Sequence, residues 1–210
     1  MKLYNSVGPN PRVVTMFIAE KGIDIETIEV DIMSGENRQE AYLKKNPGGQ
    51  SPALEMANGE ILSEITPICD YLDEKFPANS LMGETLEEKA QTRMWCRRID
   101  IKITEPMANG FRFGEGIDLF KDRMACFPES SADLKALAQD GLKWLDALLS
   151  DEFICGQRFS LADVHLFCFL DFFAGMGQPV NPELKNVSRW MEAMRQRPSV
   201  EASIHPSMRG

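Results

Sequence analysis

The 210-residue chain has few of the residues and patterns that mark several large classes of protein. It contains two histidines, which is too few for a histidine-rich metal site. Its five cysteines are scattered and none forms a C-x-x-C pair, a pattern that favours reduced thiols and a cytoplasmic location. No apolar stretch approaches the ~18 residues of a membrane span, and the N-terminus lacks the apolar run of a signal peptide.

Basic charge is also scarce. The chain has 23 Lys and Arg against 32 Asp and Glu, for a formal net charge of −9. A nucleic-acid partner would favour a basic face, so this balance argues against one. Apolar residues make up 43% of the sequence, which is enough for one large domain or two small ones.

The most strongly patterned stretch runs from Asn46 to Leu72, NPGGQSPALEMANGEILSEITPICDYL. A turn signal comes first and a short apolar strand follows over residues 53–56. Asn58-Gly59 is a strong hairpin signal, and residues 61–62 make the second strand of that hairpin. From Ser63-Glu64 the apolar positions recur at helical spacing, so a helix is expected there.

The residues before this stretch predict alternating strands and helices. The expected elements are a strand over 2–5, a helix from the cap Asn10-Pro11 to Gly22, a strand over 25–30, a polar loop over 31–38 and a short helix over 39–45. The N-terminal part therefore has the order β-α-β-α-β-β-α, and we place this domain at residues 1–76 with a linker at 77–84.

The rest of the chain, residues 85–210, needs no strand and predicts an all-helical domain. The expected helices begin at a capping box over 85–88 (kinked at Pro106), at Ser131, at a capping box over 160–163, and at Asn181-Pro182. Residues 114–128 have no clear pattern, and the tail over 203–210 is expected to be loose.

This order of elements resembles that of bacterial cytosolic glutathione S-transferases over about residues 1–200. The F-S-L-A-D string from Phe159 to Asp163 is similar to the family's capping signature in the helical domain. The resemblance implies an α/β, thioredoxin-like N-terminal domain, an all-α C-terminal domain, a homodimer, and glutathione as cosubstrate with no metal.

By that resemblance Pro52 is the cis proline of the family, and the backbone of Ser51 pairs with glutathione. An isolated Ser-Pro bond is usually trans, so the cis expectation depends on the surrounding pattern. A peptide ligand adds to such an exposed strand edge through main-chain hydrogen bonds. Gln50 matches a position that contacts the glycyl carboxylate. Arg38 is a further candidate for that end, or else a surface charge.

The γ-glutamyl end of glutathione binds, in this family, at the start of the third helix through a Glu/Gln-Ser pair. Here the pair is Glu64-Ile65, and the Ile65 side chain cannot donate a hydrogen bond. Thr66 is the adjacent substitute, and backbone N–H groups at a helix start also bind carboxylates. Glu64 is then the acceptor for the amine, although an acid in a first helical turn is favourable in any case.

The family lowers the pKa of the glutathione thiol with a Tyr, Ser or Cys near the first helix, because the thiolate is the nucleophile. Here Gly8 stands at that position. The remaining donors are the Ser6 hydroxyl, the Asn10 side chain and the helix N-terminus. Ser6 is alternatively a turn residue, and Asn10 is alternatively a simple N-cap.

The leading hypothesis is a transferase that attacks an apolar electrophile or reduces a peroxide, with a role in detoxification. Candidate walls for the electrophile, or else ordinary core, are Met107, Phe111, Arg112 and Phe113. Asp100 is a candidate contact to glutathione in a neighbouring subunit. The alternatives are a glutathione-dependent disulfide reductase and a non-catalytic binding or regulatory protein of the same fold, which Gly8 and Ile65 favour.

Overall fold

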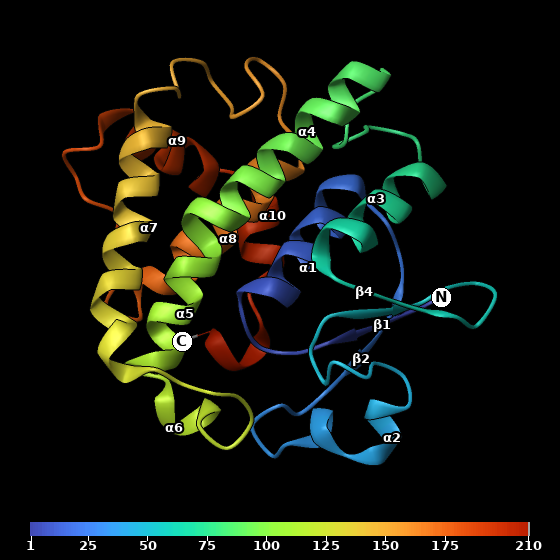
Figure 1. Cartoon of the computed structure of the whole chain (residues 1–210). Coiled ribbons are helices and arrows are strands. Elements are labelled where there is room, and N and C mark those ends of the chain that lie inside the picture. The colour runs from blue at the N-terminus through green and yellow to red at the C-terminus, as the bar shows by residue number, and fades with distance from the viewer. Residues whose placement is uncertain (210) are drawn as a thin grey trace. The chain divides into compact units, whose positions relative to one another are not determined.

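Four short strands form one mixed sheet in the computed structural model, which describes residues 1–209 (Figure 1). The strands are β1 (Lys2–Asn5), β2 (Glu26–Glu29), β3 (Ala53–Glu55) and β4 (Ile61–Ser63), in the spatial order β2-β1-β3-β4. β1 pairs with β2 in parallel, whereas β3 is antiparallel to both β1 and β4. Tyr4 lies opposite Ala53, and Ala53 lies opposite Ser63.

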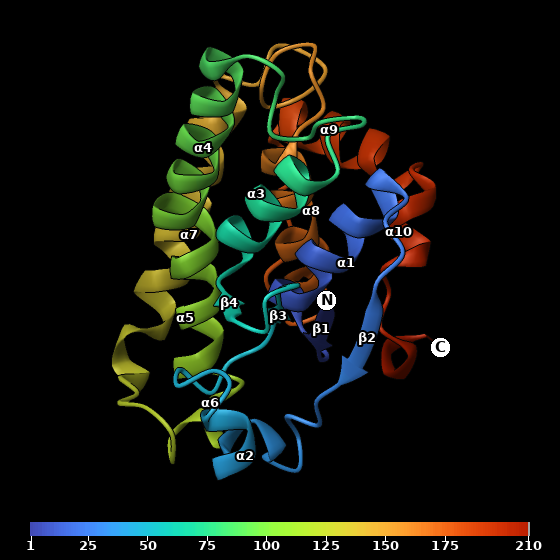
Figure 2. The same ribbon diagram turned by 90° about the vertical axis from the view of Figure 1, so that its right-hand side faces the viewer.

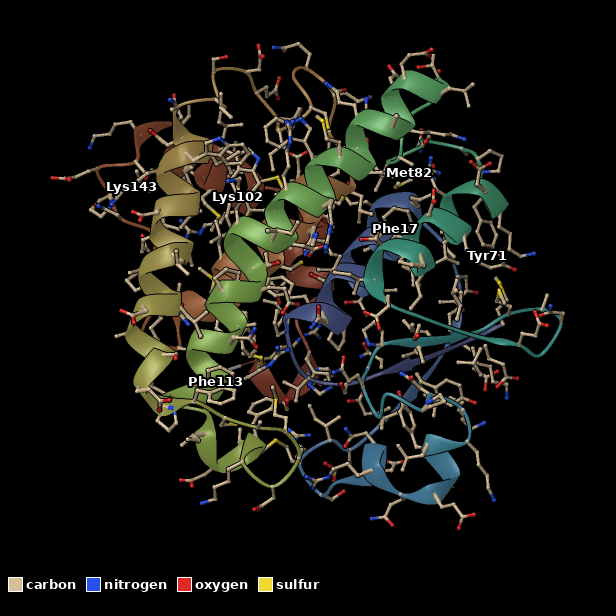
Figure 3. The ribbon with its side chains drawn as sticks, in the orientation of Figure 1. Phe17, Tyr71, Met82, Lys102, Phe113 and Lys143 are labelled. Atoms are coloured by element: carbon tan, nitrogen blue, oxygen red, sulfur yellow. The ribbon has the colours of Figure 1, made fainter. Side chains whose placement is uncertain are left out.

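Helices cover both faces of this sheet. They are α1 (Pro9–Lys21), α2 (Glu40–Leu43) and α3 (Ile65–Lys75), with a 3-10 turn over Glu36–Arg38. Figure 1 shows α1 and α3 side by side on one side of the strands and α2 on the other. Phe17 of α1 is fully buried where these two helices meet (Figure 3), and Tyr42 of α2 packs edge-on against Tyr4, with ring centroids 6.3 Å apart. The central strands β1 and β3 are therefore largely buried, as expected for a sheet between helices, whereas the edge strand β2 is mostly exposed.

Two helix starts differ from the sequence-based expectation. α1 begins at Pro9 with Gly8 as its N-cap, not at Asn10, because Gly8 adopts the extended positive-φ conformation (φ 139°) that precedes the helix. α3 begins at Ile65, because Ser63 is still the last residue of β4. The predicted end of α1 is confirmed, since Gly22 adopts the left-handed conformation of a C-cap.

The second unit, residues 83–196, is helical. Its elements are α4 (Leu86–Ile99), a π-helical segment (Asp100–Thr104), α5 (Glu105–Phe113), α6 (Ile117–Phe120), a 3-10 turn (Pro128–Ser130), α7 (Ser131–Asp146), α8 (Leu161–Ala174) and α9 (Lys185–Arg195). The predicted capping box of α4 is present, with Thr85 Oγ1 accepting from the Glu88 N–H at 3.2 Å. The irregularity expected at Pro106 is the π-helical segment directly before it. α9 begins at Lys185, because Asn181 lies in a turn in which its Oδ1 accepts from the Glu183 N–H.

α8 is buried along nearly its whole length (Figure 2), and Asp163 in its first turn fixes it. The Asp163 carboxylate accepts from the backbone N–H of Ser160 at 3.0 Å, from the N–H of Ile154 at 2.9 Å and from Trp190 Nε1 at 3.0 Å. Burial raises the pKa of Asp163 to about 6, against the lowering effect of these donors. The predicted second capping box is therefore present, and its acid also ties α8 to α9 and to the preceding loop.

The C-terminal segment packs on the N-terminal unit, and the tail predicted to be loose over 203–210 contains one helical turn within its described residues 203–209. It contains α10 (Pro198–Ala202) and a 3-10 turn (Pro206–Met208), and it groups with residues 1–82 rather than with the helical unit. Arg197 forms a two-bond ion pair with Glu20 of α1, at 2.7 and 2.8 Å. His205 Nε2 contacts Glu29 Oε1 at 2.7 Å. Within residues 1–209, none of the helices combines the length and apolar character that crossing a membrane requires.

Candidate functional site

Three of the predicted segments meet at one edge of the sheet. Ser6 follows β1, Ser51-Pro52 precedes β3, and Glu64 follows β4. The register brings them together, because the end of β1, the start of β3 and the end of β4 lie opposite one another. The Ser51 hydroxyl donates to the Tyr4 carbonyl at 3.3 Å. The Ser51-Pro52 bond is cis, as predicted.

The N-terminus of α1 lies at this edge and carries few backbone donors. Pro9 and Pro11 have no N–H, and the Arg12 N–H already donates to the Gly8 carbonyl at 3.2 Å. The helix geometry therefore leaves the N–H groups of Gly8 and Asn10 for a ligand. Asn10 lies inside the first turn and is not the cap, so the interpretation of its side chain as a simple N-cap is wrong.

Ser6 is buried beside this helix start, with 3% of its surface exposed. Its hydroxyl has no hydrogen-bond partner among the described residues, and neither has Oδ1 of the neighbouring Asn5. A buried polar atom left without a partner costs about 1–3 kcal/mol, so such atoms usually mark a place for water or a ligand. Sequence patterns give no signal for this, because the Ser6 position reads as an ordinary turn.

The N-terminus of α3 is a second group of donors at the same edge. Its first intrahelical bond runs from the Ile68 N–H to the Glu64 carbonyl, which leaves the N–H groups of Ile65 and Thr66 for a ligand. Glu64 is exposed and has a φ of 70°, which is uncommon for a residue other than glycine. Such a conformation costs about 1–3 kcal/mol and recurs at functional sites. Ile65 therefore offers its backbone donor although its side chain has none.

The loop before Pro52 is held by side chains from the neighbourhood of α2. The Gln50 carbonyl accepts from the Tyr42 hydroxyl at 2.7 Å and from Asn46 Nδ2 at 2.8 Å, while the Gln50 residue itself is exposed. Burial raises the pKa of Tyr42 to about 12, so this phenol remains a donor at neutral pH. Arg38 is exposed and its guanidinium lies against Gly35 of its own loop.

The candidates in the helical unit have partners inside that unit. Asp100 Oδ1 lies 3.2 Å from His165 Nε2, without the alignment of a hydrogen bond, and burial raises the Asp100 pKa. Met107 is fully buried in the core. Phe111 packs on Phe173 with centroids 5.7 Å apart. The remaining wall candidates are Arg112, which donates to Asn109, and Phe113, which packs on Phe127 (Figure 3).

The fold defines the class of protein. A β-α-β unit, a cis-proline turn, a hairpin and a helix form a thioredoxin-like domain, and an all-helical unit follows it. The predicted fold class is therefore confirmed. The model of the glutathione S-transferase N-terminal domain matches residues 3–80, and that of the C-terminal domain matches residues 126–198. The chain belongs to the glutathione S-transferase family.

Individual relatives agree over most of the chain. Glutathione S-transferase 2 of Saccharomyces cerevisiae is 27% identical over 210 residues, covering 96% of this chain and 88% of the relative. A maleylacetoacetate isomerase of Pseudomonas aeruginosa is 30% identical, covering 73% and 71%. The crystal structure of Gtt2 from Saccharomyces cerevisiae superposes with a TM-score of 0.90 at 27% identity, covering 97% of this chain and all of that one.

Proposed function

We propose that this protein is a glutathione transferase that binds glutathione along the sheet edge and activates its thiol. The observation that carries the proposal is the convergence of the cis Ser51-Pro52 turn with the helix starts at Gly8 and Ile65. An extended peptide adds to the strand edge at Ser51. Its carboxylate takes the N–H groups of Ile65 and Thr66, and its amine faces the Glu64 carboxylate.

In this proposal, the thiol end of glutathione lies beside the N-terminus of α1. A helix N-terminus stabilises a nearby anion by about 0.3–1 kcal/mol when exposed and up to ~2 kcal/mol when partly buried. One hydrogen bond to a charged sulfur adds roughly 1.5–3 kcal/mol. Because a pKa unit is worth ~1.36 kcal/mol, the helix alone lowers the thiol pKa by about one unit. The unpartnered Ser6 hydroxyl supplies the further donor.

The test is the ultraviolet absorbance of the bound thiolate against pH in the parent, Ser6→Ala and Asn10→Ala. We expect Ser6→Ala to raise the apparent thiol pKa by about one unit or more, since it loses a hydrogen bond to the anion. Asn10→Ala tests the second candidate donor: it keeps the Asn10 backbone N–H, so a raised thiol pKa in this variant would assign the contact with the thiolate to the Asn10 side chain. A parent without a depressed thiol pKa would instead favour a non-catalytic binding protein.

Activity measured with a panel of substrates identifies which reaction the protein catalyses. An aryl halide, a peroxide and a small disulfide distinguish conjugation, peroxide reduction and disulfide reduction. The relative named as an isomerase adds a fourth arm, glutathione-dependent isomerisation. We propose conjugation or peroxide reduction in a cytoplasmic homodimer with a role in detoxification, and the family membership supports both the cosubstrate and the dimer. Light scattering of the purified chain tests the dimer.

A further inference from the structure

The C-terminal segment that follows α10 lies close to the turn between β1 and α1. This turn, residues 6–8, leads into the helix start beside which the proposed function puts the glutathione thiol. Figure 2 shows the segment next to β2 and α1, and the contacts agree: Ser203 bonds to a residue of α1 and His205 to a residue of β2. Both ends of the N-terminal unit's sequence therefore meet beside the turn.

His205 connects this segment to the end of β1 through Glu29. Its Nδ1 accepts from the N–H of Ser207 at 3.2 Å, so the proton of the neutral ring lies on Nε2, which donates to Glu29 Oε1 at 2.7 Å. The other carboxylate oxygen of Glu29 accepts from Asn5 Nδ2 at 3.4 Å, and the two residues lie opposite each other in the parallel β1–β2 pair. Asn5 directly precedes the turn, so His205 acts on the first end of the turn through one carboxylate.

Arg12 connects the same segment to the other end of the turn. It lies in the first turn of α1, where its backbone N–H donates to the Gly8 carbonyl at 3.2 Å. Its guanidinium donates to Ser203 Oγ at 3.4 Å and to the Val200 carbonyl at 3.5 Å. The residues on both sides of the turn are therefore bonded to one segment, from opposite ends of the turn.

A cavity of about 200 Å³ lies between the turn and the C-terminal segment. Asn5 and Ser6 line it from the side of the turn, and residues 202–206 line it from the other side. Because side chains on opposite walls of a cavity do not touch, close packing does not fix the distance between the turn and the segment there. The hydrogen bonds of His205 and Arg12, which also line the cavity, therefore set that distance.

We propose that His205 is a positioning residue for thiol activation. Through Glu29 and Asn5 it holds the turn, so that the donors beside the N-terminus of α1 keep their distance from the sulfur. A hydrogen bond weakens steeply as its geometry is lost, so a displaced turn stabilises the thiolate less and the thiol pKa rises. This inference rests on the proposed function, but it holds whichever donor contacts the sulfur, and His205 itself does not contact glutathione.

The experiment measures the ultraviolet absorbance of bound glutathione thiolate against pH in the parent, His205→Ala and His205→Gln. We expect His205→Ala to raise the apparent thiol pKa by about half a unit, a roughly threefold loss in the thiolate-to-thiol ratio at a given pH. His205→Gln should restore the parent value, because its side-chain amide also donates a hydrogen bond. Binding of S-methylglutathione, which has no thiol, should be unchanged in both variants.

The matched control is Lys2→Gln, which changes a polar contact between the same two strands at the end of β1 away from the turn. Lys2 Nζ lies 3.3 Å from Glu26 Oε1, three register positions before the pair of Asn5 and Glu29. This variant should keep the thiol pKa of the parent.

Three results would overturn the inference and leave the proposed function intact: no pKa shift in His205→Ala, an equal shift in Lys2→Gln, or a shift that His205→Gln does not reverse. Weaker binding of S-methylglutathione by His205→Ala would also overturn it, since the change would then extend to the whole binding site. A parent without a depressed thiol pKa would overturn both the inference and the proposed function.

Discussion

By the family resemblance, Gly8 stands where many relatives carry a hydroxyl, and its backbone conformation accounts for a glycine at this position. Its φ of 139° is reached readily only by glycine. A Cβ at this position would have room, since Pro11 Cδ would lie 3.7 Å away, at ordinary van der Waals distance. Any penalty for a side chain therefore comes from the backbone rather than from crowding.

We accordingly expect Gly8→Ala to lower the free energy of unfolding by about 1–3 kcal/mol. The urea midpoint at constant m-value measures it. Gly175→Ala is the control, because Gly175 has an ordinary helical φ of −72° and a clear Cβ position. A Gly8→Ala midpoint equal to that of the parent would mean that the helix start can relax, and that a serine hydroxyl is also tolerated there.

Residue-level prediction succeeded where local sequence decides the outcome. The cis bond before Pro52 followed from a turn, a strand and a hairpin in fixed order. The prediction of Asn10 as the cap of the first helix was wrong. Pro9 and Pro11 are both compatible with the first turn of a helix, and the conformation of Gly8 places the start at Pro9. The unpartnered Ser6 hydroxyl could not be predicted, since burial and the lack of a hydrogen-bond partner are set by the folded surroundings and not by the local sequence.

At the scale of the element, Asp163 stabilises α8 by accepting hydrogen bonds from buried donors around the helix start. Replacement by alanine leaves three buried donors without an acceptor, on Ser160, Ile154 and Trp190. We expect Asp163→Ala to cost about 3 kcal/mol or more, with unchanged glutathione affinity in the folded fraction. Thr85→Ala removes the exposed cap of α4 and should cost only about 1 kcal/mol. Similar thermal midpoints for the two variants would contradict this role.

His165, two residues after Asp163 in α8, makes the free energy of unfolding depend on pH. Burial lowers its pKa to about 4 from 6.5, so the unfolded chain binds its proton more readily than the folded one. Its contribution to stability is therefore present above about pH 6.5 and is lost as the pH falls toward 4. The raised pKa of Asp163 acts in the opposite sense, since its contribution is present below about pH 4 and is lost as the pH rises through 6.

His165→Gln separates these opposing effects. We expect the variant to gain stability relative to the parent as the pH falls from 6.5 to 4, by about 3 kcal/mol in total. Urea unfolding of both proteins across that range measures the difference between the two curves. Parallel curves would show that the imidazole does not titrate differently in the folded and unfolded states.

Most elements were predictable because their signals are local. Alternation predicted the strand over 25–30, the hairpin signal Asn58-Gly59 predicted the two strands beside it, and the capping boxes predicted the starts of α4 and α8. α10 was missed because Pro198–Ala202 is too short to show helical periodicity, and contacts with α1 stabilise it. The π-helical segment before Pro106 was anticipated only as a kink, since one extra residue per turn leaves no compositional mark.

At the scale of the whole molecule, the C-terminal segment completes the N-terminal unit. Arg197 and Ser199 both donate to the Glu20 carboxylate; burial alone would raise the pKa of that carboxyl, but these donors hold it below its usual value. We expect Arg197→Met to destabilise this unit by roughly 2 kcal/mol, because the half-buried carboxylate loses its cation. Hydrogen exchange should accelerate at Val200 and Ser203.

A matched control is Lys44→Met, which removes an exposed cation paired with Glu40 on the surface of the same unit. It should change stability by less than about 0.5 kcal/mol. Unchanged exchange at Val200 in Arg197→Met would show that packing, rather than the ion pair, holds the segment.

The return of the chain from the helical unit to α1 also sets an order for biosynthesis. A ribosome that has just finished the sheet must translate the whole helical unit before it reaches Arg197, which takes roughly 10 s at ordinary elongation rates. During that interval the nascent sheet and its helices lack their last partner, so the face of α1 that packs against α10 is open to water and to chaperones. The first unit to emerge is therefore completed only after the whole helical unit has been synthesised.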